Sequence, residues 1–251
     1  MPKQLRLLDS GFVDSAESVA LDEAILEAHI ARKAPDTLHF YIRKSPTVSV
    51  GYFQKISESL DLDECRRRGV AIVRRKSGGS SIYTDRGQLI YGLVVSEDEL
   101  PKDRAESFKQ VCTAIARAIG SFGVDAIYRP MNDVEVGGRK ISGNAQLRRK
   151  GSLLQHGTVV VDTDLVAVDA ILKLDRSKSP SIARPSDRMT TLTKLLGRTP
   201  GIDAVKDRLA REISSILTAE LRSGRLTVFE KGIVRRLVRE RYSRDEWNLK
   251  F

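Results

Sequence analysis

Residues 132–146, NDVEVGGRKISGNAQ, are the most informative part of the sequence about the fold. Gly137-Gly138 is typical of a hairpin turn, here between the strand-like DVEV and a second strand that starts near Arg139. The apolar run LLQHGTVVVD at 153–162 follows closely enough to pair with that second strand. The stretch therefore predicts neighbouring strands joined by hairpins.

The rest of the chain alternates between strand-like runs and helical patterns. Further strand-like runs lie at 38–43, 47–51, 70–74 and 88–96. Apolar residues at helical spacing, with an apparent capping box at Asp14 and a closing Gly69, predict helices at about 15–32, 60–69, 103–121, 164–172, 201–222 and 230–242. Strand runs with hairpin links, interrupted by helices, indicate an α+β fold with a mixed, largely antiparallel β-sheet packed with α-helices.

Length and composition indicate one ordinary folded domain. The chain has 251 residues, of which 41% are hydrophobic and 30% charged, so it can bury a sizeable core and is too apolar to be disordered. We expect a single domain over 1–251 with a helical C-terminal part at 201–251. No apolar run reaches the roughly 20 residues of a membrane span, and the start lacks the apolar core of a signal peptide. We therefore expect a cytoplasmic protein without a membrane partner.

The net charge of +10 is unevenly distributed. Residues 1–139 carry 20 basic and 20 acidic side chains, whereas residues 140–251 carry 23 and 13. A basic face of this kind can bind nucleic acid, the phosphates of a nucleotide or an acidic protein, or it can be merely solvated. Aromatic residues make up only 6% of the chain, so a module that stacks nucleic-acid bases is the least favoured class.

A second special stretch, RRKSGGSSIYTD at 74–85, lies between two strand-like runs. The adjacent Gly78 and Gly79 let the backbone approach a ligand closely, and the three basic residues before Ser77 can meet an anion. The spacing is neither that of a P-loop nor that of a dinucleotide-binding loop. Taken alone, two glycines in such a loop are more often a simple turn.

Lys140 and His156 are the candidate functional side chains of the second half. A lysine at the start of a strand, just after a Gly-Gly turn, has a fixed base and a mobile ammonium that can bridge two oxyanions; the alternative is a solvated lysine. His156 lies in an apolar strand, where a histidine is more often a hydrogen-bonded core group. The three histidines show no Ser-His-Asp ordering and no metal-ligand spacing. Cys65 and Cys112 fall within helical patterns and are expected to be buried thiols.

Together these stretches resemble motifs of the lipoate–protein ligase A family. RRKSGGSSIYTD resembles the family's RRxSGGGAVxHD segment, and NDVEVGGRKISGNAQ with the later HGT resembles its ND…KKISGSAQ…HGT block. Supporting likeness runs through ALDEAIL (20–26), PTVSVGYFQ (46–54) and YSRDEWN (242–248). The resemblance therefore covers nearly the whole chain.

The resemblance implies a biotin/lipoate-ligase-like catalytic domain that uses ATP and Mg²⁺. Lipoate, or octanoate, would attack the α-phosphate of ATP, and the resulting acyl-adenylate would pass its acyl group to a lysine of a lipoyl domain. The implied acceptors are lipoyl domains of oxo-acid dehydrogenase complexes or the glycine-cleavage H protein. Lys140 matches the family's catalytic lysine, and a cation between carboxylate and phosphate would stabilise the transition state.

The resemblance also assigns binding roles by motif position, and it assigns no metal ligand. The residues that it assigns to lipoate binding are Arg75, Ser77, Gly78, Gly79 and His156. Those that it assigns to ATP binding are Lys76, Ser81, Ile82, Tyr83, Thr84, Asp133 and Lys140. Residues 175–192 match the adenylate-binding loop region. Ser80, Ser81 and Thr84 replace the family's third glycine, its alanine and its histidine.

The cysteine content separates two enzyme hypotheses. Related octanoyltransferases share this scaffold but use a cysteine nucleophile on or near the segment before the motif lysine, and here no cysteine follows Ser121. This absence favours the ATP-dependent ligase over an ATP-independent octanoyl or lipoyl acyltransferase. We expect a catalytic domain without the accessory C-terminal domain of longer ligases, so a separate small subunit is a candidate partner.

Overall fold

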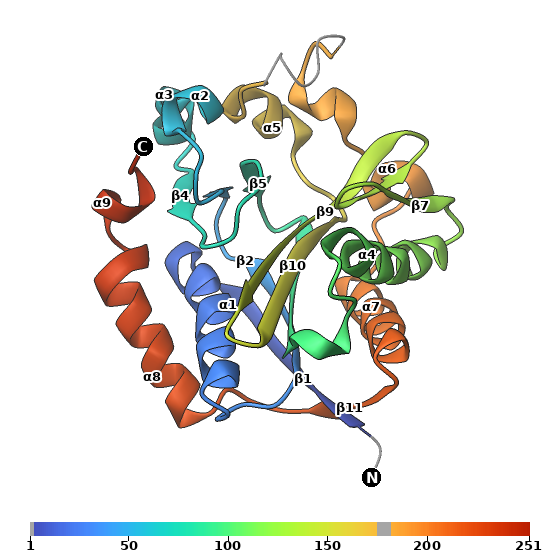
Figure 1. The fold of residues 1–251 in the computed structure, drawn as a ribbon. Helices are drawn as coiled ribbons and strands as arrows, with labels where there is room; N and C mark the ends of the chain where they lie inside the picture. Colours follow the sequence, from blue (N-terminus) through green and yellow to red (C-terminus); the bar gives the residue numbers. More distant parts are fainter. Residues whose placement is uncertain (1–2, 175–181) are drawn as a thin grey trace.

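The computed structural model describes residues 3–174 and 182–251, and its centre is an eight-stranded sheet in the order β11-β1-β2-β6-β10-β9-β8-β7 (Figure 1). Its strands are β1 (Lys3–Val13), β2 (Thr37–Arg43), β6 (Gln88–Ser96), β7 (Ala126–Arg129), β8 (Asp133–Val136), β9 (Arg139–Arg149), β10 (Ser152–Val160) and β11 (Ala219–Ser223). β1 pairs in parallel with β2 and β11, and the other neighbours are antiparallel. The predicted mixed, largely antiparallel sheet is confirmed.

A smaller sheet in the order β4-β3-β5 carries the second special stretch. Its strands are β3 (Thr47–Val50), β4 (Ala71–Arg74) and β5 (Ile82–Thr84), and its helical cover is α2 (Ile56–Ser59), α3 (Leu62–Arg67) and α5 (Leu165–Ile171). Residues 75–81 connect the two outer strands and so pass across the end of β3. Gly51, just after β3, permits this crossing, because a Cβ there would overlap the carbonyl oxygen of Gly79.

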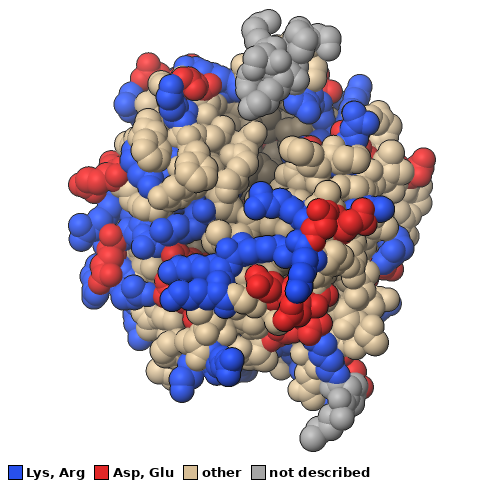
Figure 2. Space-filling view, in the orientation of Figure 1, with Lys and Arg blue, Asp and Glu red and all other residues tan. Residues whose placement is uncertain are grey.

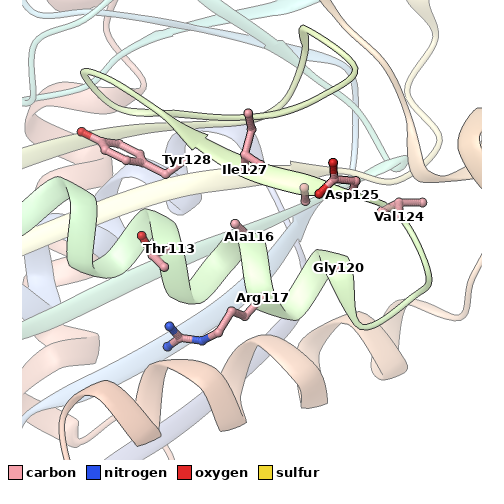
Figure 3. A pocket seen from close by; sticks show the side chains of 9 residues that line it. Thr113, Ala116, Arg117, Gly120, Val124, Asp125, Ile127 and Tyr128 are labelled. Atoms are coloured by element: carbon pink, nitrogen blue, oxygen red, sulfur yellow. The ribbon is translucent and has the colours of Figure 1, made fainter.

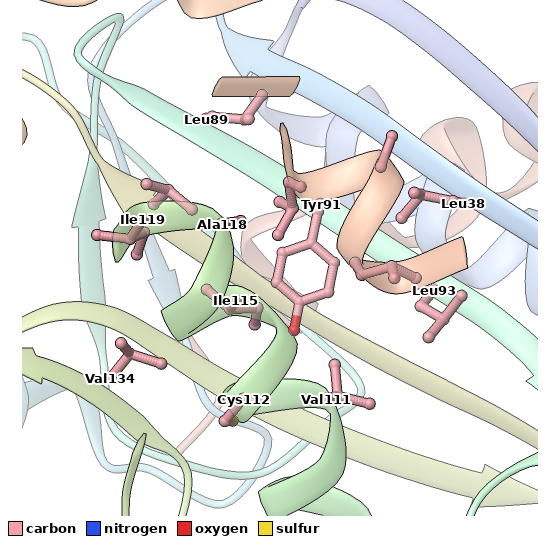
Figure 4. Close-up of a cluster of buried hydrophobic side chains, with 14 of the residues drawn as sticks. Leu38, Leu89, Tyr91, Leu93, Val111, Cys112, Ile115, Ala118, Ile119 and Val134 are labelled. Atoms are coloured by element: carbon pink, nitrogen blue, oxygen red, sulfur yellow. The ribbon is translucent and has the colours of Figure 1, made fainter. Parts of the chain in front are cut away.

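Helices cover both faces of the large sheet (Figure 1). α1 (Ser15–Ile30) and α8 (Val228–Leu237) pack together on one face, and α4 (Arg104–Gly120) and α7 (Ile202–Ile216) pack on the other. The predicted apolar stripe of α4 is buried, and Figure 4 shows it against the strands around Tyr91. The shorter elements are η1 (Glu97–Glu99), η2 (Pro185–Arg188), α6 (Leu192–Leu196), η3 (Val238–Tyr242) and α9 (Asp245–Asn248).

The C-terminal part is not wholly helical, contrary to the expectation for 201–251. The helix predicted over 201–222 ends at Ile216, and Ala219–Ser223 form β11 beside β1. The five residues AELRS are too few for alternation to be distinguished from the last turn of a helix. The second predicted helix ends as α8 at Leu237 and continues to Tyr242 as a π-helical turn.

The first strand, β1, was not predicted, because polar residues interrupt its apolar pattern. Arg6 is the fourth residue of this strand and is nevertheless buried, since its guanidinium pairs with Glu230 of α8 at 2.5 Å. The capping box at the start of α1 was also predicted wrongly. Asp14 occupies the N-cap position, but its side chain accepts no capping hydrogen bond. Among the described residues, no helix is long and apolar enough to cross a membrane.

Candidate active site

Residues 75–81, which we call the acyl loop after the role that the resemblance implies, are held in shape by Arg75. Its guanidinium donates to the carbonyl oxygens of Ser49 (2.7 Å), Gly78 (2.7 Å) and Ser80 (2.9 Å), and its Nε donates to the Ser77 hydroxyl at 3.1 Å. Burial lowers the pKa of Arg75 to about 10. Arg75 therefore shapes the loop through all its nitrogens, rather than presenting a free cation.

The backbone of the acyl loop is open to a ligand. Gly79 has φ +92°, which favours glycine, and a Cβ built on Gly78 would meet no atom within 4 Å. The backbone N–H groups of residues 76–81 donate to no acceptor in the described part of the chain. A row of unpaired N–H groups is a common feature of anion-binding loops.

A row of hydrogen bonds joins the acyl loop to β10 and α1. The Ser77 hydroxyl lies 2.6 Å from Nε2 of His156, whose Nδ1 lies 2.7 Å from Oδ2 of Asp22. The three groups thus form a Ser-His-Asp arrangement that we did not expect, because their order in the chain is Asp, Ser, His. The structure brings together the predicted Ser77 and His156, whereas Asp22 was missed.

Lys140 lies at the start of β9, directly after the predicted hairpin turn. Gly137 and Gly138 have φ +56° and +73°, as a tight turn of this kind requires. The Lys140 Nζ lies 2.7 Å from Oδ1 of Asp133, on β8. Its side chain runs over Gly143, where a Cβ would be 2.5 Å from the Nζ. Glycine at 143 is therefore what allows the lysine to lie along the strand.

The lysine and the histidine lie on the same part of the sheet. Gly143 pairs with Thr158 and Ala145 pairs with His156, so these side chains share one face of β9 and β10. Gly143, over which the lysine side chain runs, is two residues, about 7 Å, along β9 from Ala145, the cross-strand partner of His156. A lipoate carboxylate and the α-phosphate of a nucleotide could meet in such a space.

The start of β8, where Asp133 lies, is fixed by two asparagines of the motif to which no role was assigned from the sequence. Asn144 donates from its Nδ2 to the carbonyl of Asn132 at 2.9 Å, and Asn132 donates back to the carbonyl of Asn144. Tyr91 donates its buried hydroxyl to Oδ1 of Asn144 at 2.6 Å. These hydrogen bonds fix the position of Asn132, which precedes Asp133, and so they help to position the ion-pair partner of Lys140.

The residues assigned to ATP are not all gathered at one place. Lys76 lies over the rings of Trp247 (4.7 Å) and Tyr52 (5.8 Å), and burial lowers its pKa. Ser81 donates to the Gln54 side chain at 2.7 Å. The side chains of Tyr83 and Thr84 are buried in the small sheet, next to the half-buried Ile82. The side chains of Tyr83 and Thr84 are therefore not placed to contact a bound nucleotide.

The predicted adenylate-binding loop region can be followed only in part, because 175–181 lie outside the described residues. Met189 forms a parallel bridge with Lys140, and Thr190 donates its N–H to the Lys140 carbonyl at 3.0 Å. The segment after η2 therefore runs beside the predicted catalytic lysine. This position is compatible with a nucleotide-covering role, which remains a prediction.

Other features of the described residues do not coincide with this site. The hollow in Figure 3 lies between α4 and β7, and none of the predicted site residues lines it. Within the described ranges, no group of three or more His, Cys, Asp or Glu side chains could hold a metal ion. Both cysteines are buried, as expected.

The fold and the site define an enzyme of the class that attaches lipoyl or octanoyl groups to proteins. More narrowly, the chain belongs to the lipoyl protein ligase A/B catalytic domain family, whose model matches residues 14–214. Octanoyltransferase LipM of Geobacillus kaustophilus is 32% identical over 98% of both chains. Lipoate-protein ligase A subunit 1 of Thermoplasma acidophilum is 33% identical over 92% of this chain and 91% of its own.

Solved structures of lipoate ligases superpose closely on this chain. The bi-partite lipoate protein ligase of Thermoplasma acidophilum has a TM-score of 0.84 at 31% identity, over 99% of this chain and 96% of its own. A lipoate-protein ligase A bound with ATP has a TM-score of 0.85 at 30% identity, over 99% of both chains. The predicted family and fold class are confirmed. By their names, however, relatives such as LipM favour the alternative, octanoyl transfer, over the ATP-dependent ligase that we expected first.

Proposed function

We propose that this chain activates lipoate or octanoate with ATP and transfers the acyl group to a lysine of a lipoyl domain. The acid would lie against the acyl loop and the Ser77–His156 pair. The α-phosphate would lie toward Lys140, whose side chain runs over Gly143, two residues along β9 from the cross-strand partner of His156. The Lys140 ammonium lies 2.7 Å from Asp133 as an ion pair, and its three protons can be donated to substrate oxygens.

The observation that carries this proposal is that both cysteine thiols are buried. Transfer through a covalent thioester needs an accessible thiolate, yet Cys65 and Cys112 are 1% and 0% exposed. Figure 4 shows Cys112 among apolar side chains of α4 and the sheet. Burial and the nearby Asp133 raise the pKa of Cys112 to about 12. An adenylate supplies an activated acyl group without any enzyme thiol.

The residues around Lys140 suit the phosphates of a nucleotide and a magnesium ion. Mg²⁺ is commonly held by one or two carboxylates together with substrate phosphates, so it needs no complete cage of protein ligands. Asp133 is the carboxylate beside Lys140, and its Oδ1 makes no hydrogen bond of good geometry in spite of the 2.7 Å ion pair. This carboxylate would hold the ion, which would offset charge on the phosphates.

The second candidate function is octanoyl transfer from a carrier thioester, and the names of the LipM relatives favour it. A thioester is already activated, so this reaction would not consume ATP. The acceptor amine would attack the thioester carbonyl directly, since neither thiol of this chain is accessible. Lys140 would then stabilise the oxyanion instead of a phosphate.

The acceptor would be an acidic lipoyl domain, of an oxo-acid dehydrogenase complex or a glycine-cleavage H protein. A band of Lys and Arg crosses the middle of the face in front of the β9–β10 hairpin (Figure 2). Complementary charge of this kind accelerates and orients association. The ligase of Thermoplasma acidophilum is bi-partite, so a separate small subunit is part of the proposal, as is a cytoplasmic location.

Two assays on the purified chain separate the candidates. Lipoate-dependent exchange of pyrophosphate into ATP reports adenylate formation, and it should be repeated with a candidate small subunit. Transfer from octanoyl carrier protein to a lipoyl domain without ATP reports the alternative. We expect exchange in at least one condition. Octanoyl transfer without any exchange would overturn the ligase proposal and leave the transferase.

A further inference from the structure

A row of buried hydroxyl and amide groups crosses the centre of the large sheet on the face that α4 covers. Tyr91 on β6 is fully buried beside apolar side chains of α4 (Figure 4), and its cross-strand neighbour on β10 is Gly157. Gly157 pairs in turn with Asn144 on β9. Directly opposed residues point to the same face of a sheet, so Tyr91 and Asn144 lie on either side of a position without a side chain.

Glycines make room for polar groups on both faces of these central strands. A Cβ at Gly157 would lie 2.1 Å from Oδ1 of Asn144 and 2.8 Å from Cε1 of Tyr91. The space lets the Tyr91 hydroxyl reach across β10 and donate to Oδ1 of Asn144 at 2.6 Å. On the opposite face a Cβ at Gly92 would lie 2.9 Å from Oδ1 of Asp22, so this glycine accommodates the carboxylate in the same way.

The hydrogen bonds of the row run in one direction, from β10 through Tyr91 to β9. Nε2 of Gln155 donates to the Tyr91 oxygen at 3.0 Å, and Oε1 of Gln155 accepts from Gln146 at 2.6 Å. The Tyr91 proton is donated to Oδ1 of Asn144, so Nδ2 of Asn144 points to the carbonyl of Asn132, 2.9 Å away. The hydroxyl thus determines which end of this amide faces Asn132.

The row lies behind Lys140, on the other side of the sheet from its side chain. Successive residues of a strand point to opposite faces, so Asn144 points away from the face on which Lys140 lies over Gly143. Asn132 directly precedes Asp133, whose Oδ1 lies 2.7 Å from the Lys140 Nζ. The row can therefore act on the lysine only through the position of residues 132 and 133.

We propose that Tyr91 is a positioning residue for Lys140. Its hydroxyl holds the Asn144 amide in the orientation that fixes Asn132, and it thereby keeps Asp133 where this carboxylate orients the lysine ammonium. Burial raises the pKa of Tyr91 well above its ordinary value, so the hydroxyl remains a donor at neutral pH. The inference rests on the proposed function, which gives Lys140 its part in the reaction.

The test compares the steady-state kinetics of Tyr91→Phe and wild type in lipoate-dependent ATP–pyrophosphate exchange. We expect kcat to fall about 10- to 100-fold, because displacing a catalytic group by about 1 Å costs on the order of 10²-fold. KM for lipoate and for ATP should be nearly unchanged, since the lost interaction bears on the transition state. Wild-type kcat in the folded variant would overturn the inference.

Tyr242→Phe is the matched control for the loss of a buried hydroxyl. The Tyr242 side chain is 1% exposed, and its hydroxyl donates to Glu23 of α1 in a different part of the core. We expect this variant to keep the wild-type kcat. A loss equal to that of Tyr91→Phe would overturn the inference, because it would show that any buried tyrosine hydroxyl affects the reaction equally.

A double variant distinguishes positioning from general loosening of the core. Asp133→Ala removes the group through which Tyr91 acts on Lys140, so adding Tyr91→Phe to it should lower kcat by less than about twofold. The same large loss in both backgrounds would overturn the inference. If wild type transfers octanoyl groups without exchange, the ligase proposal fails, and the same comparison on octanoyl transfer still decides the role of Tyr91.

Hydrogen exchange tests the link between Tyr91 and residues 132–133 without any activity. The N–H of Asn144 donates to the Asn132 carbonyl at 3.1 Å, so its exchange rate reports how firmly the two segments are joined. We expect faster deuterium uptake over residues 131–145 in Tyr91→Phe than in wild type, and the wild-type rate in Tyr242→Phe. Equal rates in all three proteins would overturn the inference, even if the chain catalyses neither reaction.

Discussion

The ammonium of Lys140 and the carboxylate of Asp133 lie 2.7 Å apart, on two strands joined by the Gly137-Gly138 turn. The pair is only partly buried, with 32% of the lysine side chain and 20% of the aspartate side chain exposed. A partly solvated pair of this kind contributes little to stability. Under the proposed function, the pair holds a cation where negative charge would develop during the reaction.

Replacing Lys140 should therefore remove activity and keep the fold. We expect Lys140→Ala to lower lipoate-dependent ATP–pyrophosphate exchange by about 10²- to 10³-fold, the usual effect of losing one group that stabilises the transition state. The melting temperature should change by only a few degrees. Lys102→Ala, an exposed lysine on the loop before α4, is the matched control and should retain full exchange. Exchange at the wild-type rate in Lys140→Ala would remove the lysine from the mechanism.

Substituting Gly143 should reduce exchange activity about as strongly as substituting Lys140, whose side chain it accommodates. In Gly143→Ala the new methyl group would overlap Lys140 Cε and lie 2.5 Å from its Nζ, so the side chain must leave the strand. Displacing a catalytic group by about 1 Å costs on the order of 10²-fold in rate. We expect that loss in the exchange assay. Gly120→Ala in α4 is the control, because its Cβ meets no atom within 4 Å; an equal loss there would contradict a local effect.

The strands around Lys140 follow from local sequence, whereas the sheet edge at β1 and β11 does not. Gly137-Gly138 sets a turn that fixes β8 and β9, and the following apolar run pairs as expected with β9. β1 depends on Arg6, whose burial is offset by Glu230, 224 residues later in the chain. No local pattern carries that pairing, since a buried arginine looks like an exposed one in sequence.

The site was predictable in the same uneven way. Ser77, His156 and Lys140 were proposed from their motifs, and the structure brings the Ser77 hydroxyl to His156 on β10 and places Lys140 on the neighbouring β9. Asp22 was missed because its partner lies 134 residues away and because its access depends on Gly92, a glycine that looks like any other strand residue. Contacts between distant strands, and contacts that depend on the space left by a glycine, produce no periodic pattern in the sequence.

The thiols should be dispensable for both acyl transfer and exchange. We expect Cys65→Ala and Cys112→Ala, singly and together, to keep wild-type activity at a temperature where they are folded. Cys112→Ala should lower the free energy of unfolding by about 1–2 kcal/mol, since it removes a buried sulfur from a packed core. Intact-protein mass spectrometry after incubation with octanoyl carrier protein should show no acyl adduct on either cysteine. An adduct on Cys112 that disappears in Cys112→Ala would establish a thioester mechanism.

The buried pair of Arg6 and Glu230 predicts the response of the fold to acid. Burial alone would raise the pKa of Glu230, but hydrogen bonds from Arg6 and Thr227 outweigh it and lower the pKa. A carboxyl group with a lowered folded-state pKa stabilises the fold above its unfolded value of about 4.3, and it loses that contribution as the pH falls through the folded-state pKa. The free energy of unfolding of the wild type should therefore decrease below about pH 5.

The Glu230→Gln variant separates this pair from general acid sensitivity. At neutral pH it should lose about 3 kcal/mol or more, because it leaves the Arg6 guanidinium buried without a charge partner. It should also show a shallower loss of stability on acidification, measured by urea unfolding at about pH 7 and about pH 4. Glu58→Gln breaks an exposed pair with Lys55 and is the matched control, for which we expect less than about 0.5 kcal/mol. Identical pH slopes in wild type and Glu230→Gln would show that acid unfolding is governed by other carboxyl groups.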